Sequence, residues 1–163
     1  MVWIQGGQTE RAVEVLRAEL KRSRDYVVPY IFAVALLRSG VDPAAPAAAE
    51  AVQALRASIR ASPQFAPAHA ELGRLLLKRD QLELAIKELE KAAELDPGGR
   101  PALYALSQAY RKKGDGGRAQ ALLSRVSKLN AEERGEDPDR ELRRALVRIV
   151  REGTAPPRKP AEE

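Results

Sequence analysis

Few residues in this chain could do chemistry. The 163-residue sequence has one histidine, His69, and no cysteine, so disulfides, thiolate metal ligands and a cysteine nucleophile are excluded. His69 falls at a packing position of an expected helix, where we interpret it as a half-buried structural residue. No metal-ligand cluster and no glycine-rich phosphate loop before a helix with Lys and Ser or Thr is present. The sequence therefore predicts no catalytic, cofactor-binding or metal-binding residues, and a protein that is not an enzyme.

The charged residues are numerous but mixed in sign. The 28 Lys and Arg against 23 Asp and Glu give a net charge of +5 and a pI of about 9.7. A nucleic-acid-binding module usually concentrates its basic residues on one face, whereas here the two signs are interspersed through most expected helices. The glutamates around Glu83, Glu88, Glu90 and Glu94 alternate with lysines and indicate a solvated helix face. Nucleic acid is a disfavoured partner, and a basic helical-repeat nucleic-acid-binding module is kept as an alternative.

The C-terminal region carries a row of arginines on an expected helix over residues 137–153. Arg140, Arg144, Arg148 and Arg151 lie on one side of it. They could contact RNA or an acidic membrane surface, but no aromatic residues are interleaved with them for base stacking. We interpret this helix as a cap, with an apolar stripe that covers the last repeat and a basic side that faces water.

A recurring pair of small and large residues indicates the architecture. The steps from Ala51 to Ala85 and from Ala85 to Ala119 are both 34 residues. A fixed period of this size is typical of stacked helix pairs rather than of one globular core. We therefore expect an all-α fold. In four places an alanine precedes a leucine by four residues on one expected helix face: Ala12–Leu16, Ala51–Leu55, Ala85–Leu89 and Ala119–Leu123.

The repeats are unequal in regularity. Residues 66–99 and 100–133 have the same offsets, while a Pro- and Ala-rich loop distorts the spacing upstream. The predicted organisation is a partial N-terminal repeat (the second helix of a pair) over 1–24, a degenerate repeat over 25–65, regular repeats over 66–99 and 100–133, a capping helix over 137–153 and a disordered tail over 154–163.

Glycine, proline and capping residues predict where the less regular helices begin and end. Thr9 can cap a helix from Glu10 to about Arg22, and the first seven residues are expected to close an earlier helix, with Gly6-Gly7 in a turn. Gly116-Gly117 is expected to fray the start of the last regular helix. Further helices are expected over 30–38 and 48–61.

Over residues 66–133 the chain resembles the tetratricopeptide repeat (TPR) family, which repeats every 34 residues. The resemblance implies an all-α, right-handed α-solenoid of antiparallel helix pairs with a C-terminal capping helix, and a role in protein–protein interaction. The matching positions are Leu72-Gly73, Leu76, Ala85, Leu89, Ala92 and Pro97 in one repeat, and Leu106-Ser107, Tyr110, Gly114, Ala119, Leu123 and Val126 in the next.

In that family the first helix of each pair lines a concave surface. Arg38, Lys78 and Lys112 occupy the same place in three successive repeats, so stacking would align them as a ladder. Such a row favours acidic peptides or a terminal carboxylate through charge-assisted hydrogen bonds. The alternative is that each cation complements a helix C-terminal dipole. The predicted partner-binding residues are Arg38, Arg74, Lys78, Tyr104, Gln108, Arg111 and Lys112.

These observations predict a non-catalytic adaptor or scaffold that binds a partner peptide or helix in the concave groove. A second interpretation is the C-terminal recruiting arm of a larger protein or enzyme. The incomplete N-terminal repeat could also support oligomerisation. No signal-like segment or stretch of roughly 20 apolar residues is present, and we predict a cytoplasmic protein, or a periplasmic one if the chain is a fragment of a secreted parent. Ala- and Arg-rich usage suggests a bacterial source.

Overall fold

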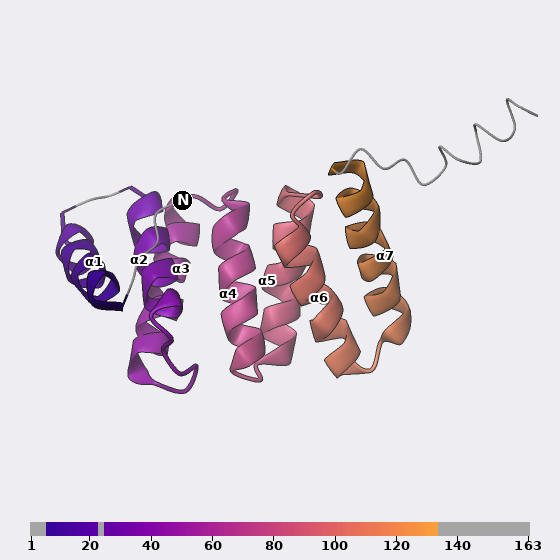
Figure 1. Cartoon of the computed structure of the whole chain (residues 1–163), viewed down its shortest axis with the longest axis horizontal. Coiled ribbons are helices and arrows are strands. Elements are labelled where there is room, and N and C mark those ends of the chain that lie inside the picture. Colours follow the sequence, from indigo (N-terminus) through magenta and orange to yellow (C-terminus); the bar gives the residue numbers. More distant parts are fainter. Residues whose placement is uncertain (1–5, 23–24, 134–163) are drawn as a thin grey trace, which may run out of the picture. The chain divides into compact units, whose positions relative to one another are not determined.

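A computed structural model describes residues 6–22 and 25–133, and within these ranges the secondary structure is entirely helical (Figure 1). The all-α prediction is therefore confirmed. The chain divides into two compact units, Met1–Val126 and Ser127–Glu163, and the account below concerns the first. The helices are α1 (Gly6–Glu19), α2 (Val27–Arg38), α3 (Pro46–Ala61), α4 (Ala66–Lys78), α5 (Leu82–Leu95), α6 (Arg100–Lys113) and α7 (Gly116–Glu133).

Prolines and turn residues set several of the helix ends. Pro46, Pro67 and Pro101 lie in the first turns of α3, α4 and α6, where a missing N–H leaves no hydrogen bond unmade. Gly114 ends α6 with a φ of 89°, a left-handed conformation that glycine adopts without steric cost. Asp80 takes the corresponding place after α4 with a φ of 55°, which is uncommon for a residue with a side chain.

Four helix starts differ from the sequence prediction, among them that of α3, which begins at Pro46 rather than at residue 48. Helix α1 begins at Gly6 and ends at Glu19, so the expected turn at Gly6-Gly7 and the later start were wrong. Helix α2 begins at Val27, where the backbone N–H donates to Asp25 Oδ1 at 2.9 Å. Helix α7 begins at Gly116 without the expected fraying. There the Arg118 N–H donates to Asp115 Oδ1 at 3.0 Å, and this cap satisfies a donor that the first turn leaves open.

The helices pack in chain order, each against the next from α1 to α6, and α4 also contacts α6. Figure 1 shows these helices side by side. The interior is made of leucines with alanines between them, and Leu55, Leu89 and Leu103 are completely buried. Close approach depends on Gly73 of α4, because a Cβ atom there would lie 2.5 Å from Leu89 Cγ of α5. Alternating small and large side chains thus allow tight interhelical packing.

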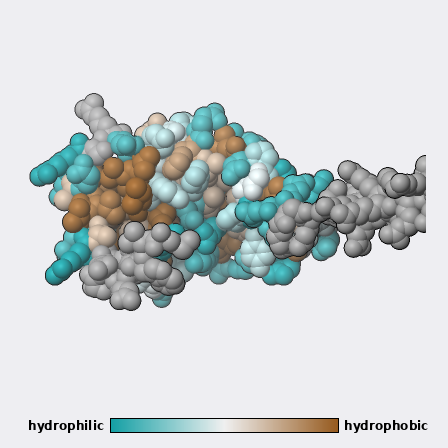
Figure 2. All heavy atoms as spheres, turned by 45° about the horizontal axis from the view of Figure 1, so that its top comes forward, coloured by the Kyte–Doolittle hydropathy of each residue, from teal (hydrophilic) through white to brown (hydrophobic). Residues whose placement is uncertain are grey.

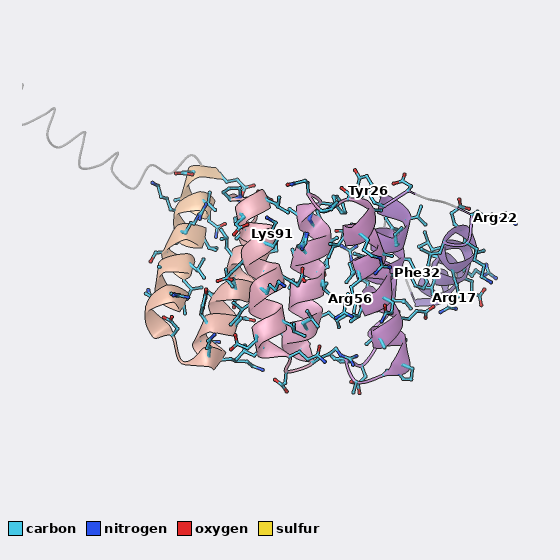
Figure 3. The ribbon with its side chains drawn as sticks, turned by 180° about the vertical axis from the view of Figure 1, so that it is seen from behind. Arg17, Arg22, Tyr26, Phe32, Arg56 and Lys91 are labelled. Atoms are coloured by element: carbon cyan, nitrogen blue, oxygen red, sulfur yellow. The ribbon has the colours of Figure 1, made fainter. Side chains whose placement is uncertain are left out.

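Two further contacts hold the irregular N-terminal part. Arg17 of α1 pairs with Glu50 of α3 at 2.9 Å and lies over the ring of Phe32 in α2, with 5.6 Å to the ring centroid (Figure 3). Arg79 Nη1 donates to the Pro43 carbonyl at 2.8 Å, which ties the Pro- and Ala-rich loop to the end of α4. The distorted repeat is therefore integrated into the stack.

The predicted capping helix over 137–153 and the tail over 154–163 lie outside the described residues, and the predicted repeat boundaries stay predictions. Of the helices described, none has the length and apolar character needed to cross a membrane.

Candidate functional site

A hollow of about 720 Å³ lies between α4 and α6. Six of the seven predicted partner-binding residues come together here, although they are up to 38 positions apart in the sequence. Arg74 and Lys78 come from α4, and the other four come from α6. The lining residues are Arg74, Leu77, Lys78, Pro101, Tyr104, Ala105, Gln108, Arg111 and Lys112.

The seventh predicted residue, Arg38, lines a neighbouring hollow of about 200 Å³ between α2 and α4. Arg74 and Lys78 line both hollows, so the two are adjacent. We call the combined feature the α2–α4–α6 groove. The lining of its smaller part is completed by Val34, Leu37, Glu71 and Leu75.

The groove has an apolar floor and a polar rim. Leu77 and Ala105 are almost completely buried beneath it, while Tyr104 keeps 51% of its surface exposed. A half-exposed aromatic ring beside aliphatic side chains offers a partner apolar contact area together with a hydroxyl group. This composition resembles the core of a typical binding site, in which a few polar groups fix the orientation of an apolar ligand surface.

Only some of the groove cations remain available for a ligand. Arg74 pairs with Glu71 on its own helix, and Lys112 Nζ pairs with Asp80 Oδ1, each at 2.7 Å. Arg38, Lys78 and Arg111 make no ion pair with any other residue that the structure describes. Of the expected ladder of Arg38, Lys78 and Lys112, only the first two cations are therefore available to a ligand, because Lys112 is already paired with Asp80.

The Lys112–Asp80 pair leads to a testable expectation. The Lys112 ammonium donates to the Asp80 carboxylate and lowers its pKa below the ordinary value of 3.8, since a nearby positive charge favours the ionised form. Replacing Lys112 by alanine is expected to raise the pKa of Asp80 back toward that value, as measured by an NMR titration of the carboxyl carbon. Lys113→Ala, which removes the neighbouring pair with Glu83, serves as the control and should leave the Asp80 titration unchanged.

The sign of the pH effect follows from the direction of the shift. A depressed pKa in the folded state means that the pair stabilises the protein above pH 3.8 and that this contribution is lost as the pH falls through the folded-state pKa. An Asp80 titration that is unaffected by Lys112→Ala would show that the two side chains do not pair in solution.

His69 has a structural role. It is only 6% exposed, and its Nδ1 atom lies 2.7 Å from Glu88 Oε2. The Nε2 atom lies 3.1 Å from the Pro63 carbonyl oxygen. The ring thus joins α4, α5 and the turn before α4. Within residues 6–22 and 25–133, no group of three or more His, Cys, Asp and Glu side chains is arranged to hold a metal ion.

Sequence reasoning missed most of a third hollow, of about 190 Å³, at the N-terminal ends of α4 and α6. It shares Glu71 and Pro101 with the groove. The Pro-Ala dipeptides that open both helices were the available signal, since small residues leave space where two helices meet. We call it the N-terminal hollow, and its lining residues are Tyr30, Ala66, Pro67, Ala70, Glu71, Ala92, Asp96, Gly99, Pro101 and Ala102.

Comparison with known proteins agrees with this geometry. The profile of the tetratricopeptide repeat family matches residues 81–137. This part of the chain is therefore similar to tetratricopeptide repeats, in agreement with the resemblance found in the sequence. No curated protein gave a significant match over the sequence.

Several solved structures have the same fold. A crystal structure of MamA matches 79% of this chain and 72% of its own, with 21% identity and a TM-score of 0.69. MamA from Desulfovibrio magneticus RS-1, residues 41 to the end, matches 80% of this chain and 70% of its own, with 28% identity and a TM-score of 0.66. YrrB, described as a TPR protein with an unusual peptide-binding site, matches 76% of this chain and 61% of its own, with 18% identity and a TM-score of 0.64.

Proposed function

We propose that this protein is a non-catalytic interaction module that binds a segment of a partner protein in the α2–α4–α6 groove. The observation that carries this proposal is the pair of adjacent hollows across three helices, with an apolar floor and three cations that have no ion-pair partner among the described residues. A partner with acidic side chains would offer those cations charge-assisted hydrogen bonds. The peptide-binding site of YrrB supports the assignment by analogy of fold.

The other predicted roles rest on different features. A recruiting arm of a larger protein would use the same groove and needs no separate site. Oligomerisation would instead involve the N-terminal end, where Val15 of α1 and Ile31 of α2 are exposed and Figure 2 shows hydrophobic surface. The cytoplasmic location also stays a prediction. A nucleic-acid ligand would use the same cations through phosphate contacts, which strong dependence of binding on salt would reveal.

The groove can be tested with peptides selected from a random library on the immobilised full chain. Replacing Tyr104 by alanine is expected to weaken the selected peptides about tenfold or more, because truncating a central aromatic contact commonly costs over 1 kcal/mol. The dissociation constant is measured by fluorescence anisotropy.

Leu84→Ala provides the matched control, because Leu84 of α5 is 50% exposed but lines none of the three hollows. Its affinity should stay within about twofold of the wild type, as for a surface residue outside the contact. If Tyr104→Ala binds the peptides normally and Leu84→Ala does not, the groove is not the binding site and the proposal is wrong.

A further inference from the structure

Each of the three groove helices is followed by a residue with a left-handed backbone, and one of these residues is acidic. Gly40 and Gly114 follow α2 and α6 with φ angles of 80° and 89°, and Asp80 takes the equivalent place after α4 with a φ of 55°. The turns at Asp80 and Gly114 share two backbone hydrogen bonds, from this residue to the carbonyl three positions earlier and from the next residue to the carbonyl five positions earlier. The backbone of this turn therefore does not need an acidic side chain.

Stability does not explain the choice of aspartate at position 80 either. Glycine is the residue that most often takes the left-handed place after a helix, because a Cβ atom disfavours that conformation. Among the described residues, the Asp80 carboxylate makes one hydrogen bond, which it accepts from Lys112 Nζ at 2.7 Å. The Asp80 side chain is 84% exposed, and an ion pair at such a site contributes little to folding.

Comparison of two successive repeats shows what Asp80 does to the groove. Lys78 and Lys112 hold equivalent positions, and both line the groove. The turn of the repeat before Lys78 carries Gly40, which has no side chain, and Lys78 has no ion-pair partner among the described residues. The turn of the repeat before Lys112 carries Asp80, and Lys112 is paired with it. A single side chain therefore distinguishes a groove lysine that is open to a ligand from one that is occupied.

We infer that Asp80 is an internal competitor for acidic ligands of the groove. Its carboxylate occupies Lys112, so an acidic side chain of a partner has to displace it before that lysine can pair with the partner. Asp80 thereby lowers the affinity of the groove for acidic ligands and leaves Arg38, Lys78 and Arg111 as the cations that pair without competition. Both members of the pair are exposed, so displacement needs no change in the core. This inference rests on the proposed function and identifies a residue that limits the affinity of the site.

Two substitutions of Asp80 in the full chain test the inference. Asp80→Gly introduces the residue of the other two turns, and Asp80→Asn removes only the charge. The probe is a fluorescein-labelled synthetic peptide in which glutamate and leucine alternate, and its dissociation constant is measured by fluorescence anisotropy. Each variant is expected to bind the peptide about two- to fivefold more tightly than the wild type, the range that one exposed ion pair supplies. The gain should become smaller at higher salt concentration, because salt screens exposed charges.

Two further variants separate release of Lys112 from a change in net charge. Glu83→Gln removes the same charge from the neighbouring pair with Lys113, a lysine that lines none of the three hollows, and it should leave the affinity unchanged. Adding Lys112→Ala to Asp80→Asn should abolish the gain, because the released lysine is then absent. A gain that survives Lys112→Ala, or that Glu83→Gln reproduces, comes from net charge alone and overturns the inference.

Thermal unfolding tests the alternative that the pair only ties two repeats together. Asp80→Gly is expected to unfold at the same temperature as the wild type or at a higher one, because glycine adopts the left-handed conformation without steric strain. A clear loss of thermal stability together with an unchanged affinity for the peptide would give the pair a structural role, and the inference would be wrong.

The outcomes separate this inference from the proposed function. If Tyr104→Ala weakens the binding of the acidic peptide but the Asp80 variants bind it like the wild type, the groove is the site and only this inference fails. If Tyr104→Ala and the Asp80 variants all bind the peptide as well as the wild type, the groove is not the site and both ideas fail. If neither the wild type nor the Asp80 variants bind the peptide, this inference is overturned, while library-selected peptides still decide the proposed function.

Discussion

Replacement of Leu89 by alanine is expected to lower the free energy of unfolding by about 2–5 kcal/mol, the range for truncation of a completely buried leucine. Leu89 has no exposed surface, and its Cγ atom lies where a side chain at Gly73 would have to be. Its removal leaves a cavity between α4 and α5, which the well-packed surroundings can fill only in part. Chemical denaturation followed by circular dichroism measures the effect.

The same contact predicts that the effect of a second substitution on stability depends on whether Leu89 is present. Gly73→Ala would gain about 1 kcal/mol of helix propensity, but the new methyl group would meet Leu89 at 2.5 Å, and overpacking typically costs about 1–3 kcal/mol. We expect net destabilisation in the wild type and a smaller cost, or none, in the Leu89→Ala background. The Ala85 carbonyl, 3.1 Å from the added Cβ, keeps the relief from being complete.

Gly116→Ala is the control for helix propensity, because nothing lies within 4 Å of a Cβ at that position. It should be neutral or stabilising. If Gly73→Ala stabilises the wild type as much as it stabilises the Leu89→Ala variant, α4 and α5 do not approach as closely as described here.

Simultaneous replacement of Arg38, Lys78 and Arg111 by glutamate is expected to weaken acidic-peptide binding by about 100-fold or more. An ion pair at an exposed site contributes up to about 1 kcal/mol, so three lost contacts amount to roughly 3 kcal/mol before repulsion is added. Binding is measured by fluorescence anisotropy at two salt concentrations, since screening weakens exposed charge pairs.

A control triple variant replaces Arg56, Arg60 and Lys87 by glutamate and so changes the net charge by the same amount. These residues lie on α3 and α5 outside the three hollows, with Arg56 and Lys87 exposed and Arg60 exposed. Figure 3 labels Arg56 on this part of the molecule. The control should bind normally.

Measuring stability tests the alternative that the groove cations serve only their own helices. A cation in the last turn of a helix stabilises it by about 0.3–1 kcal/mol through the helix dipole. If the groove triple variant loses stability but binds acidic peptides as tightly as the control, the cations only complement helix dipoles. The alternative nucleic-acid role is favoured if the wild type binds nucleic acid with a steep salt dependence, and the groove triple variant loses that binding but keeps its affinity for peptides.

Much of the candidate groove could be predicted from local sequence alone. Lys78 and Lys112 have equivalent positions because the chain repeats with a period of 34 residues, and the resemblance to TPR proteins placed both on the inner side of the stack. Repetition makes such predictions transferable, because each repeat meets its neighbours in the same way. The predicted set therefore came together in space even though its members come from three helices.

The partners of individual charges could not be predicted in this way. Asp80 is in a turn, and its contact with Lys112 spans 32 positions, so it depends on how one repeat is stacked on the next. The start of α7 was also missed, because capping by Asp115 outweighs the low helix propensity of two glycines. In both cases one specific hydrogen bond decided what composition left open.

The sequence by itself determined the class of fold and the helix faces that would line a groove, since both follow from the period and order of small, large and charged residues. Only the tertiary structure decided which cations remain without an ion-pair partner among the described residues and where small residues leave the N-terminal hollow. These properties arise from distances between side chains of different repeats, and such distances are set by the packing of whole helices rather than by any local segment of the chain.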